Sequence, residues 1–111
     1  MSDVCHEMHE GEILNREKVH TTLYKATLYG DRVECAKFSK RLSCAIKHLP
    51  LQIQFFFEYD TQKAIEMGVV KSPTLLLNNH IFLEGLVQAE VITKAFEKLL
   101  EEEKTFSRTL Q

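Results

Sequence analysis

The segment Leu51–Tyr59, with the sequence LQIQFFFEY, alternates between apolar and polar residues at first and then becomes apolar throughout. This pattern indicates a strand that is buried on both faces of a sheet. Before it, apolar residues at helical spacing predict a helix over about 34–48, which Leu49-Pro50 ends. A further strand is predicted over 19–29, where β-branched and aromatic residues are interleaved up to the turn at Gly30-Asp31. Strand, helix and buried strand in this order predict a right-handed βαβ unit with parallel strands.

The remaining elements follow from shorter patterns. A short helix is predicted over about 62–67, ended by Gly68. Two apolar runs, Leu75–Leu77 and His80–Leu83, are joined by Asn78-Asn79 and predict a β-hairpin, because Asn tolerates the positive φ that such turns need. A closing helix is predicted over about 87–103. The order β-α-β-α-β-β-α predicts an α/β fold with a four-stranded mixed sheet and helices on both faces.

The chain of 111 residues is expected to form one domain over residues 19–104. Residues 1–18 are polar and are interpreted as an N-terminal tail, and residues 105–111 as a C-terminal tail. The formal net charge is -2, so neither nucleic acid nor an anionic membrane is an expected partner. The chain has no apolar run of about 20 residues, and its start lacks the pattern of a signal peptide. We therefore expect a cytoplasmic protein whose 3 cysteines are thiols.

Two stretches carry a resemblance to a known family. The first is Gly68–Asn78, with the sequence GVVKSPTLLLN, and the second is Leu28-Tyr29-Gly30, followed by Cys35 at the predicted start of a helix. They resemble the thioredoxin-like and glutaredoxin-like redox proteins, especially the small prokaryotic redox-active disulfide proteins. The resemblance covers the predicted domain and implies a thioredoxin-like fold. It also implies a reactive Cys35, a cis peptide bond before Pro73, and a Ser72 backbone that pairs with an extended thiol substrate.

The sequence departs from the family at its active site. The family has Cys-x-x-Cys, whereas this chain has Cys35-Ala36-Lys37-Phe38 and lacks the second cysteine. Cys44 cannot replace it, because nine residues along a helix span about 13 Å, and a disulfide needs Cα atoms within about 7 Å.

The reactivity of Cys35 has two interpretations. A position at a helix N-terminus favours the thiolate, as do Lys37 and Arg32, whereas Glu34 opposes it. Alternatively, Cys35 lies on the same helical stripe as Phe38 and is a small buried residue of the core.

Two hypotheses about function follow. In the first, the protein is a thiol-disulfide oxidoreductase with Cys35 as nucleophile and Ser72, Pro73 and Lys37 as substrate-binding residues. Its partner is a protein disulfide or a low-molecular-weight thiol, an external thiol resolves the mixed disulfide, and no cofactor is needed. Iron–sulfur cluster binding ranks lower, because the Gly-Phe-Ser that usually follows the cysteine is absent. In the second, the protein is a redox-inactive thioredoxin-like module that binds a protein partner. The sequence predicts no oligomeric state.

The N-terminal residues Cys5, His6 and His9 could contribute to a zinc or copper site. A closed structural zinc site takes four ligands, however, and this segment offers three of the usual soft type. We therefore interpret the segment as a flexible tail and predict no metal.

Overall fold

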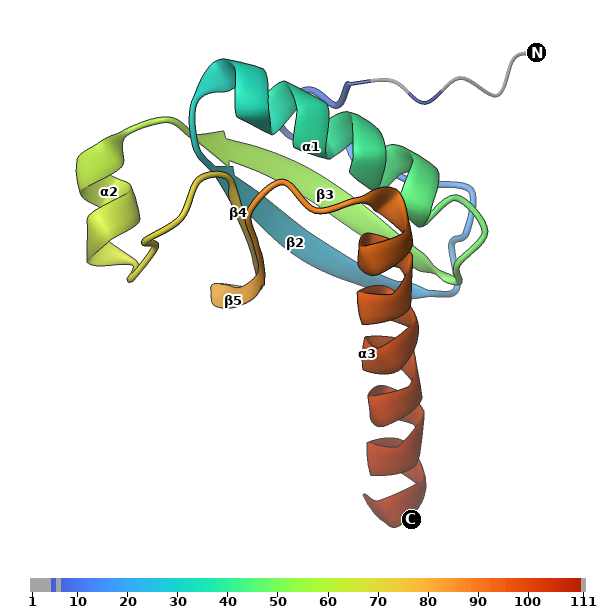
Figure 1. The fold of residues 1–111 in the computed structure, drawn as a ribbon. Coiled ribbons are helices and arrows are strands. Elements are labelled where there is room, and N and C mark those ends of the chain that lie inside the picture. Colours follow the sequence, from blue (N-terminus) through green and yellow to red (C-terminus); the bar gives the residue numbers. More distant parts are fainter. Residues whose placement is uncertain (1–4, 6, 111) are drawn as a thin grey trace.

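The structure is a computed structural model that describes the backbone of residues 5 and 7–110, and the side chains of this range up to Glu103. It contains one mixed sheet and three helices, which confirms the predicted α/β class (Figure 1). Its elements in chain order are β1 (Ile13–Leu14), β2 (Thr22–Tyr29), α1 (Arg32–Ala45), β3 (Leu51–Glu58), α2 (Thr61–Glu66), β4 (Thr74–Leu77), β5 (His80–Glu84) and α3 (Ala89–Leu110).

The strands lie in the order β1-β3-β2-β4-β5. β2 and β3 are parallel and connected by α1, as the sequence predicts. β4 is antiparallel to β2 and pairs Thr74 with Tyr29, and β4 and β5 form the predicted hairpin. The carboxyl ends of β2 and β3 therefore meet the start of β4 at one end of the sheet.

The prediction of four strands is wrong, because β1 is a fifth strand. Ile13 and Leu14 pair antiparallel with β3 at the edge of the sheet. Two residues are too few to show the alternation from which a strand is recognised in a sequence.

The N-terminal segment, which we interpreted as a polar tail over residues 1–18, has extensive contacts from Met8 onward. Met8 is buried in the main core, and its backbone N–H donates to Ser39 Oγ at 3.2 Å. The Asn15 amide donates to the carbonyl oxygens of Ile46 at 2.8 Å and Leu51 at 3.1 Å. Residues from Met8 to Asn15, which include β1, therefore form a strap that contacts β3 and α1, and the polar composition did not reveal it.

α1 is fixed at both ends by local interactions. Asp31 is its N-cap, and the Asp31 carboxylate accepts the backbone N–H of Glu34 at 2.7 Å. The helix ends at Ala45, three residues before the predicted end, and the chain then turns toward Pro50 and β3. Its apolar stripe is completely buried and faces the sheet.

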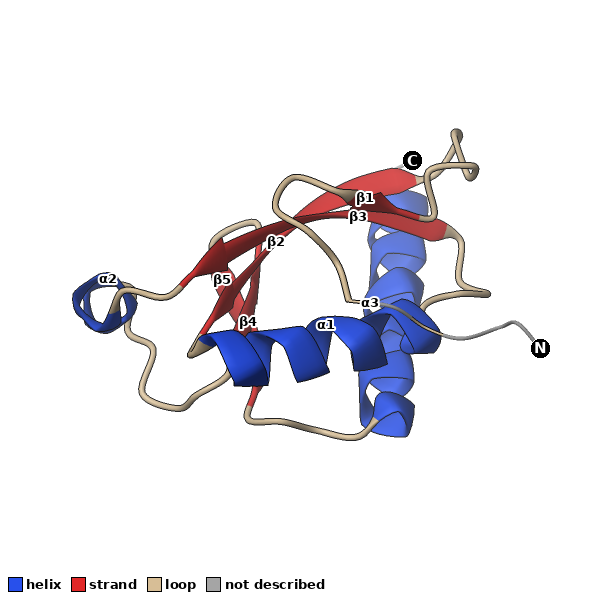
Figure 2. Cartoon of the chain, turned by 90° about the horizontal axis from the view of Figure 1, so that it is seen from above, coloured by secondary structure: helices blue, strands red, loops and turns tan. Residues whose placement is uncertain are grey.

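The helices cover the two faces of the sheet unequally (Figures 1 and 2). α1 and α3 lie on one face, and their residues share the main core with alternate residues of β2 and β3. The Thr93 hydroxyl of α3 donates to the Ala45 carbonyl of α1 at 2.9 Å. On the other face, Ala64 of α2 packs on a smaller cluster of Tyr29, Val69 and Leu76. α2 therefore covers only the end of the sheet at which β2 and β3 finish.

α3 is longer than predicted and continues to Leu110, so that residues 105–110 are helical instead of forming a tail. Its C-terminal part projects away from the sheet (Figure 1). The Tyr24 hydroxyl donates to the Glu103 carboxylate at 2.6 Å where the helix leaves the body of the protein. Among the helices formed by the described residues, none combines the length and the apolar character that crossing a membrane requires.

Candidate functional site

The predicted site lies where β2, α1 and the loop before β4 meet. The Ser72–Pro73 peptide bond is cis, as the resemblance implies, and Pro73 is buried. Two hydrogen bonds hold this loop: the Thr74 hydroxyl donates to the Lys71 carbonyl at 2.7 Å, and the Gly85 N–H donates to the Pro73 carbonyl at 2.7 Å.

Gly30 allows this loop to approach the end of β2. A Cβ atom added at Gly30 would lie 2.8 Å from Ser72 Oγ and 3.2 Å from Pro73 Cα, which is closer than Cβ atoms normally come to other atoms. The absence of a side chain at this position therefore brings the β2–α1 turn into contact with Ser72 and Pro73.

Cys35 lies in the first turn of α1, and its side chain faces the core. It is 1% exposed, and its thiol donates to the backbone carbonyl of Leu28 at 3.7 Å. Burial, followed by the charges of Asp31 and Glu34, raises the pKa of the Cys35 thiol to about 12. The helix N-terminus, which favours the thiolate, therefore does not dominate at this position.

Glu34 of α1 contacts the loop before β4. The Ser72 hydroxyl donates a hydrogen bond to the Glu34 carboxylate. Lys37, predicted to be beside the thiol, is exposed and lines a different depression near Cys44. The structure thus brings Ser72 and Pro73 together with Gly30 and Glu34. Cys35 is buried against Leu28, and Lys37 lines a different depression.

A groove of about 310 Å³ opens beside Ser72. Its walls are the ends of β2 and β3, one side of α2, and the segment 69–72. Three large apolar side chains in these walls are exposed, namely Tyr59, Ile65 and Val70, the last of them to 82%. Apolar side chains exposed together in a groove are typical of a binding surface.

The rim of the groove is mainly acidic. Asp31, Glu58 and Asp60 line it, together with the single lysine Lys71. Arg32 does not line the groove, and its guanidinium lies 4.4 Å from the centre of the Tyr59 ring. The groove therefore presents apolar walls between carboxylates.

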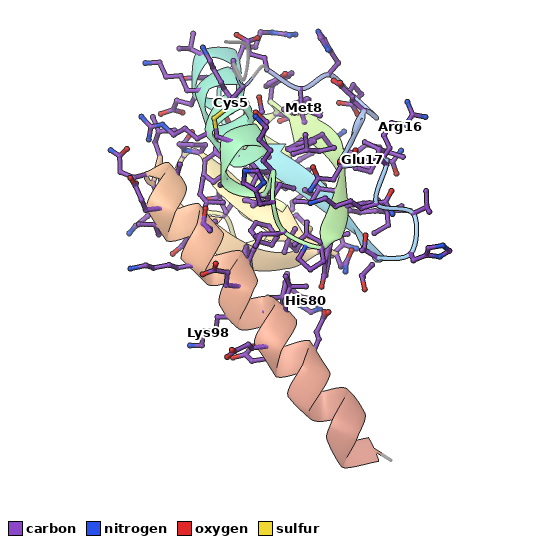
Figure 3. All side chains as sticks on the ribbon, turned by 90° about the vertical axis from the view of Figure 1, so that its right-hand side faces the viewer. Cys5, Met8, Arg16, Glu17, His80 and Lys98 are labelled. Atoms are coloured by element: carbon purple, nitrogen blue, oxygen red, sulfur yellow. A yellow bond between two sulfur atoms is a disulfide. The ribbon has the colours of Figure 1, made fainter. Side chains whose placement is uncertain are left out.

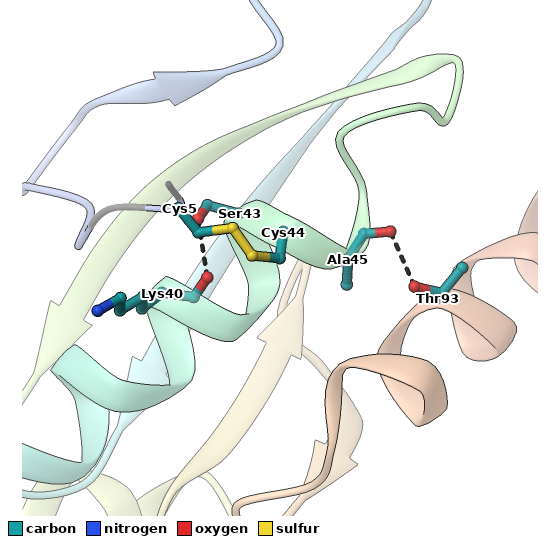
Figure 4. The surroundings of a disulfide bond; sticks show 6 residues. All are labelled: Cys5, Lys40, Ser43, Cys44, Ala45 and Thr93. Atoms are coloured by element: carbon teal, nitrogen blue, oxygen red, sulfur yellow. Dashed lines mark hydrogen bonds between the residues drawn. A yellow bond between two sulfur atoms is a disulfide. The ribbon is translucent and has the colours of Figure 1, made fainter. Parts of the chain in front are cut away.

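Cys5 and Cys44 form a disulfide, which corrects the expectation that all three cysteines are thiols. The bond joins the N-terminal segment to the last turn of α1 (Figure 4). Cys5 cannot act as a metal ligand in this state, and His6 lies outside the described residues. In the part of the chain that the structure describes, no three His, Cys, Asp or Glu side chains lie close enough to hold a metal ion.

The sequence analysis missed the Glu34–Ser72 contact in the site and the Cys5–Cys44 disulfide outside it. The Glu34–Ser72 contact depends on how α1 is rotated relative to the loop before β4, and no local pattern reveals that. The disulfide joins cysteines 39 positions apart, one of them in a polar segment, and no spacing rule connects them. Comparison of the chain with protein-family models, curated proteins and solved structures found no match.

Proposed function

We propose that this chain is a thioredoxin-like module that binds an extended segment of a partner protein in the groove beside Ser72, and that Cys35 takes no part in thiol chemistry. The observation that carries the proposal is the contrast between two neighbouring features. The Cys35 side chain is 1% exposed and does not line the groove, while the groove itself is open and has exposed apolar walls.

Thiol exchange at Cys35 would require a thiolate that can reach a disulfide. With a pKa of about 12, roughly one thiol in 10⁵ is ionised at pH 7. The hydrogen bond to the Leu28 carbonyl also holds the sulfur on the core side of β2. These features favour the second of the two hypotheses from the sequence.

The groove offers an extended chain both backbone and side-chain contacts. Among the described residues, none forms a hydrogen bond with the backbone N–H or C=O of Val70 or Ser72. An extended segment can pair with such free backbone groups in the manner of an added strand, while its side chains enter the groove. The Val70 and Ile65 side chains would contact apolar side chains of the segment.

The negative charge of the groove's rim indicates the charge of the segment that it would bind. Asp31, Glu58 and Asp60 line the groove, and Glu58 is paired with Lys63 at 3.7 Å. The favoured segment therefore carries at least one Lys or Arg, which Asp31 and Asp60 would attract. Binding should therefore weaken as the salt concentration rises.

The proposal is tested by selecting peptides from a random library on the folded, disulfide-bonded protein. The affinity of the selected peptides is then measured by calorimetry for four proteins: wild type, Val70→Asp, Val19→Asp and Cys35→Ala. Val19 is the matched control, because it is 68% exposed and precedes β2 at the opposite end of the sheet. We expect Val70→Asp to weaken binding by about tenfold or more, and the other two variants to bind as wild type does.

Two results would overturn the proposal. One is that no peptide is enriched, or that selected peptides bind wild type and Val70→Asp equally. The other is rapid iodoacetamide labelling of Cys35 in the folded protein near pH 7, which would support the single-cysteine oxidoreductase instead.

A further inference from the structure

The Cys5–Cys44 disulfide lies at the opposite end of α1 from the groove. Cys44 is exposed and belongs to the last turn of the helix, and Cys5 is partly exposed (Figures 3 and 4). Cys35 and Cys44 are separated by nine residues of helix, or about 13 Å. The disulfide is therefore both accessible and remote from the peptide site.

A depression of about 600 Å³ surrounds the disulfide. Its described walls contain both cysteines and Ala89, and every charged residue in them is a cation: Lys37, Lys40 and Arg41. The Arg41 guanidinium is fixed by hydrogen bonds from Nη1 to the carbonyl oxygens of Leu86 at 3.2 Å and Val87 at 3.0 Å. Three cations next to an accessible disulfide attract small anions and stabilise a thiolate formed there.

We propose that this depression is a site of thiol–disulfide exchange for a small thiol that carries carboxylate groups. Lys37, Lys40 and Arg41 bind the carboxylates, and Cys44 is the sulfur that is attacked because it is the more exposed of the pair. The proposal does not depend on peptide binding in the groove.

The exchange consists of two balanced steps. The thiolate of the small thiol attacks Cys44 Sγ, a new S–S bond forms, and the Cys5–Cys44 bond breaks. Cys5 Sγ leaves with the bonding electrons and takes a proton from water. A second molecule of the small thiol then attacks the first one's sulfur, which releases Cys44 as a thiolate and yields the disulfide of the small thiol. The protein disulfide gains two electrons, and two small thiols are oxidised.

Exchange releases from α1 only the part of the chain that precedes the strap. Met8 stays in the core, its N–H stays bonded to Ser39, and β1 stays paired with β3, because none of these contacts involves the disulfide. The site is thus a reversible attachment of the residues before Met8.

The test measures the rate at which thiols open the disulfide in the folded protein, with mass spectrometry to locate the mixed disulfide. Glutathione, which is anionic, is compared with neutral 2-mercaptoethanol. Each rate is divided by the thiolate concentration and by the rate for the same protein unfolded in urea. The double variant Lys37→Gln/Lys40→Gln is compared with Lys94→Gln/Lys98→Gln, in which two exposed lysines of α3 are changed (Figure 3 labels Lys98).

We expect the normalised rate for glutathione to exceed that for 2-mercaptoethanol by about tenfold, since a cationic site concentrates anions by that order. Lys37→Gln/Lys40→Gln should remove most of this advantage, because it slows the reaction of glutathione much more than that of 2-mercaptoethanol, which has no carboxylates. The α3 variant should behave as wild type does. The first mixed disulfide should be on Cys44. Equal normalised rates, a mixed disulfide on Cys5, or no opening before the protein unfolds would each overturn the proposal. Peptide affinity, measured separately on Cys5→Ser/Cys44→Ser, reports on the groove alone.

Discussion

The Cys35 thiol donates a hydrogen bond to the backbone carbonyl of Leu28 across a distance of 3.7 Å. Both residues are completely or almost completely buried in the main core, so the thiol is directed toward the backbone of β2. A sulfur in this position has to leave its hydrogen bond and its packing before it can react. Its environment therefore stabilises the neutral thiol, so ionisation of Cys35 at alkaline pH should favour unfolding.

The free energy of unfolding should fall as the pH rises from about 9 to about 12. The pKa of Cys35 is about 12 in the folded protein and about 8.5 for an unperturbed thiol. In this interval the unfolded chain loses the proton and the folded chain keeps it, so ionisation favours unfolding by up to about 1.4 kcal/mol per pH unit. Burial also raises the pKa values of Tyr24, Tyr29 and Tyr59, which act in the same direction.

Urea unfolding of Cys5→Ser/Cys44→Ser with and without Cys35→Ala isolates the effect of this thiol. The serine background prevents disulfide exchange, and the tyrosines contribute equally to both proteins. The free energy of unfolding of the Cys35→Ala protein, minus that of the protein that retains Cys35, should increase at each step between pH 8.5 and pH 10.5. A constant difference across this range would show that Cys35 ionises normally in the folded state.

Met8→Ala should reduce the free energy of unfolding by about 2–4 kcal/mol, the usual cost of truncating a buried Met. Met8 is 5% exposed within the main core, although it lies in a polar stretch of sequence. Glu17→Ala is the control, because Glu17 is exposed in the same N-terminal segment, and it should change stability by less than about 0.5 kcal/mol. Both are measured by urea unfolding with the disulfide intact. Equal stability of the two variants would mean that the strap contributes nothing through Met8.

Asn15→Ala should destabilise the protein more than Asn15→Gly. Asn15 has a φ of 64°, and its side chain donates to the carbonyl oxygens of Ile46 and Leu51. Both variants lose these hydrogen bonds, at a cost of about 1–2 kcal/mol. The alanine variant should lose about 1 kcal/mol more in free energy of unfolding, because alanine disfavours the left-handed conformation that glycine adopts freely. Thermal and urea unfolding of the pair measure the difference, and a glycine variant no more stable than the alanine variant would contradict this account.

The sequence predicted the elements that are long enough to show a period. α1, β3 and the hairpin all have apolar patterns over several residues, and each appears close to its predicted position. The strap was missed for the opposite reason. Its contacts come from single residues, Met8 and Asn15, whose neighbours are polar, and its strand has only 2 residues.

Whether the Cys35 backbone N–H is free or bonded within α1 depends on where the helix begins. We predicted a start near Glu34, which would place Cys35 among the free amide groups at the helix N-terminus. The helix instead begins at Arg32 with Asp31 as its cap, so that Cys35 is its fourth residue. The Cys35 N–H therefore donates to the Asp31 carbonyl at 2.9 Å instead of remaining free, while the side chain keeps its place on the apolar stripe with Phe38. A pattern of apolar residues does not fix a helix start so closely.

Gly30→Ala should displace the loop before β4, and so affect both the stability of the protein and the shape of the groove. Its new Cβ would meet Ser72 Oγ at 2.8 Å and the backbone of Pro73 at 3.2 Å. The Pro73 carbonyl is bonded to Gly85 and the Lys71 carbonyl to Thr74, so the loop cannot move away without losing these hydrogen bonds. Gly68→Ala is the matched control, because Gly68 also has a positive φ but has no atom within 4 Å of the corresponding position.

We expect Gly68→Ala to cost about 1 kcal/mol through its backbone conformation alone. Gly30→Ala should cost a further 1–3 kcal/mol, roughly the penalty for overpacking. It should also weaken the selected peptides, since Ser72 and Val70 lie in the loop that is displaced. Urea unfolding and calorimetric titration measure the two effects on the same samples. If Gly30→Ala lost stability and yet bound the peptides as Gly68→Ala does, the peptide would have to bind away from Ser72, and the groove would not be its site.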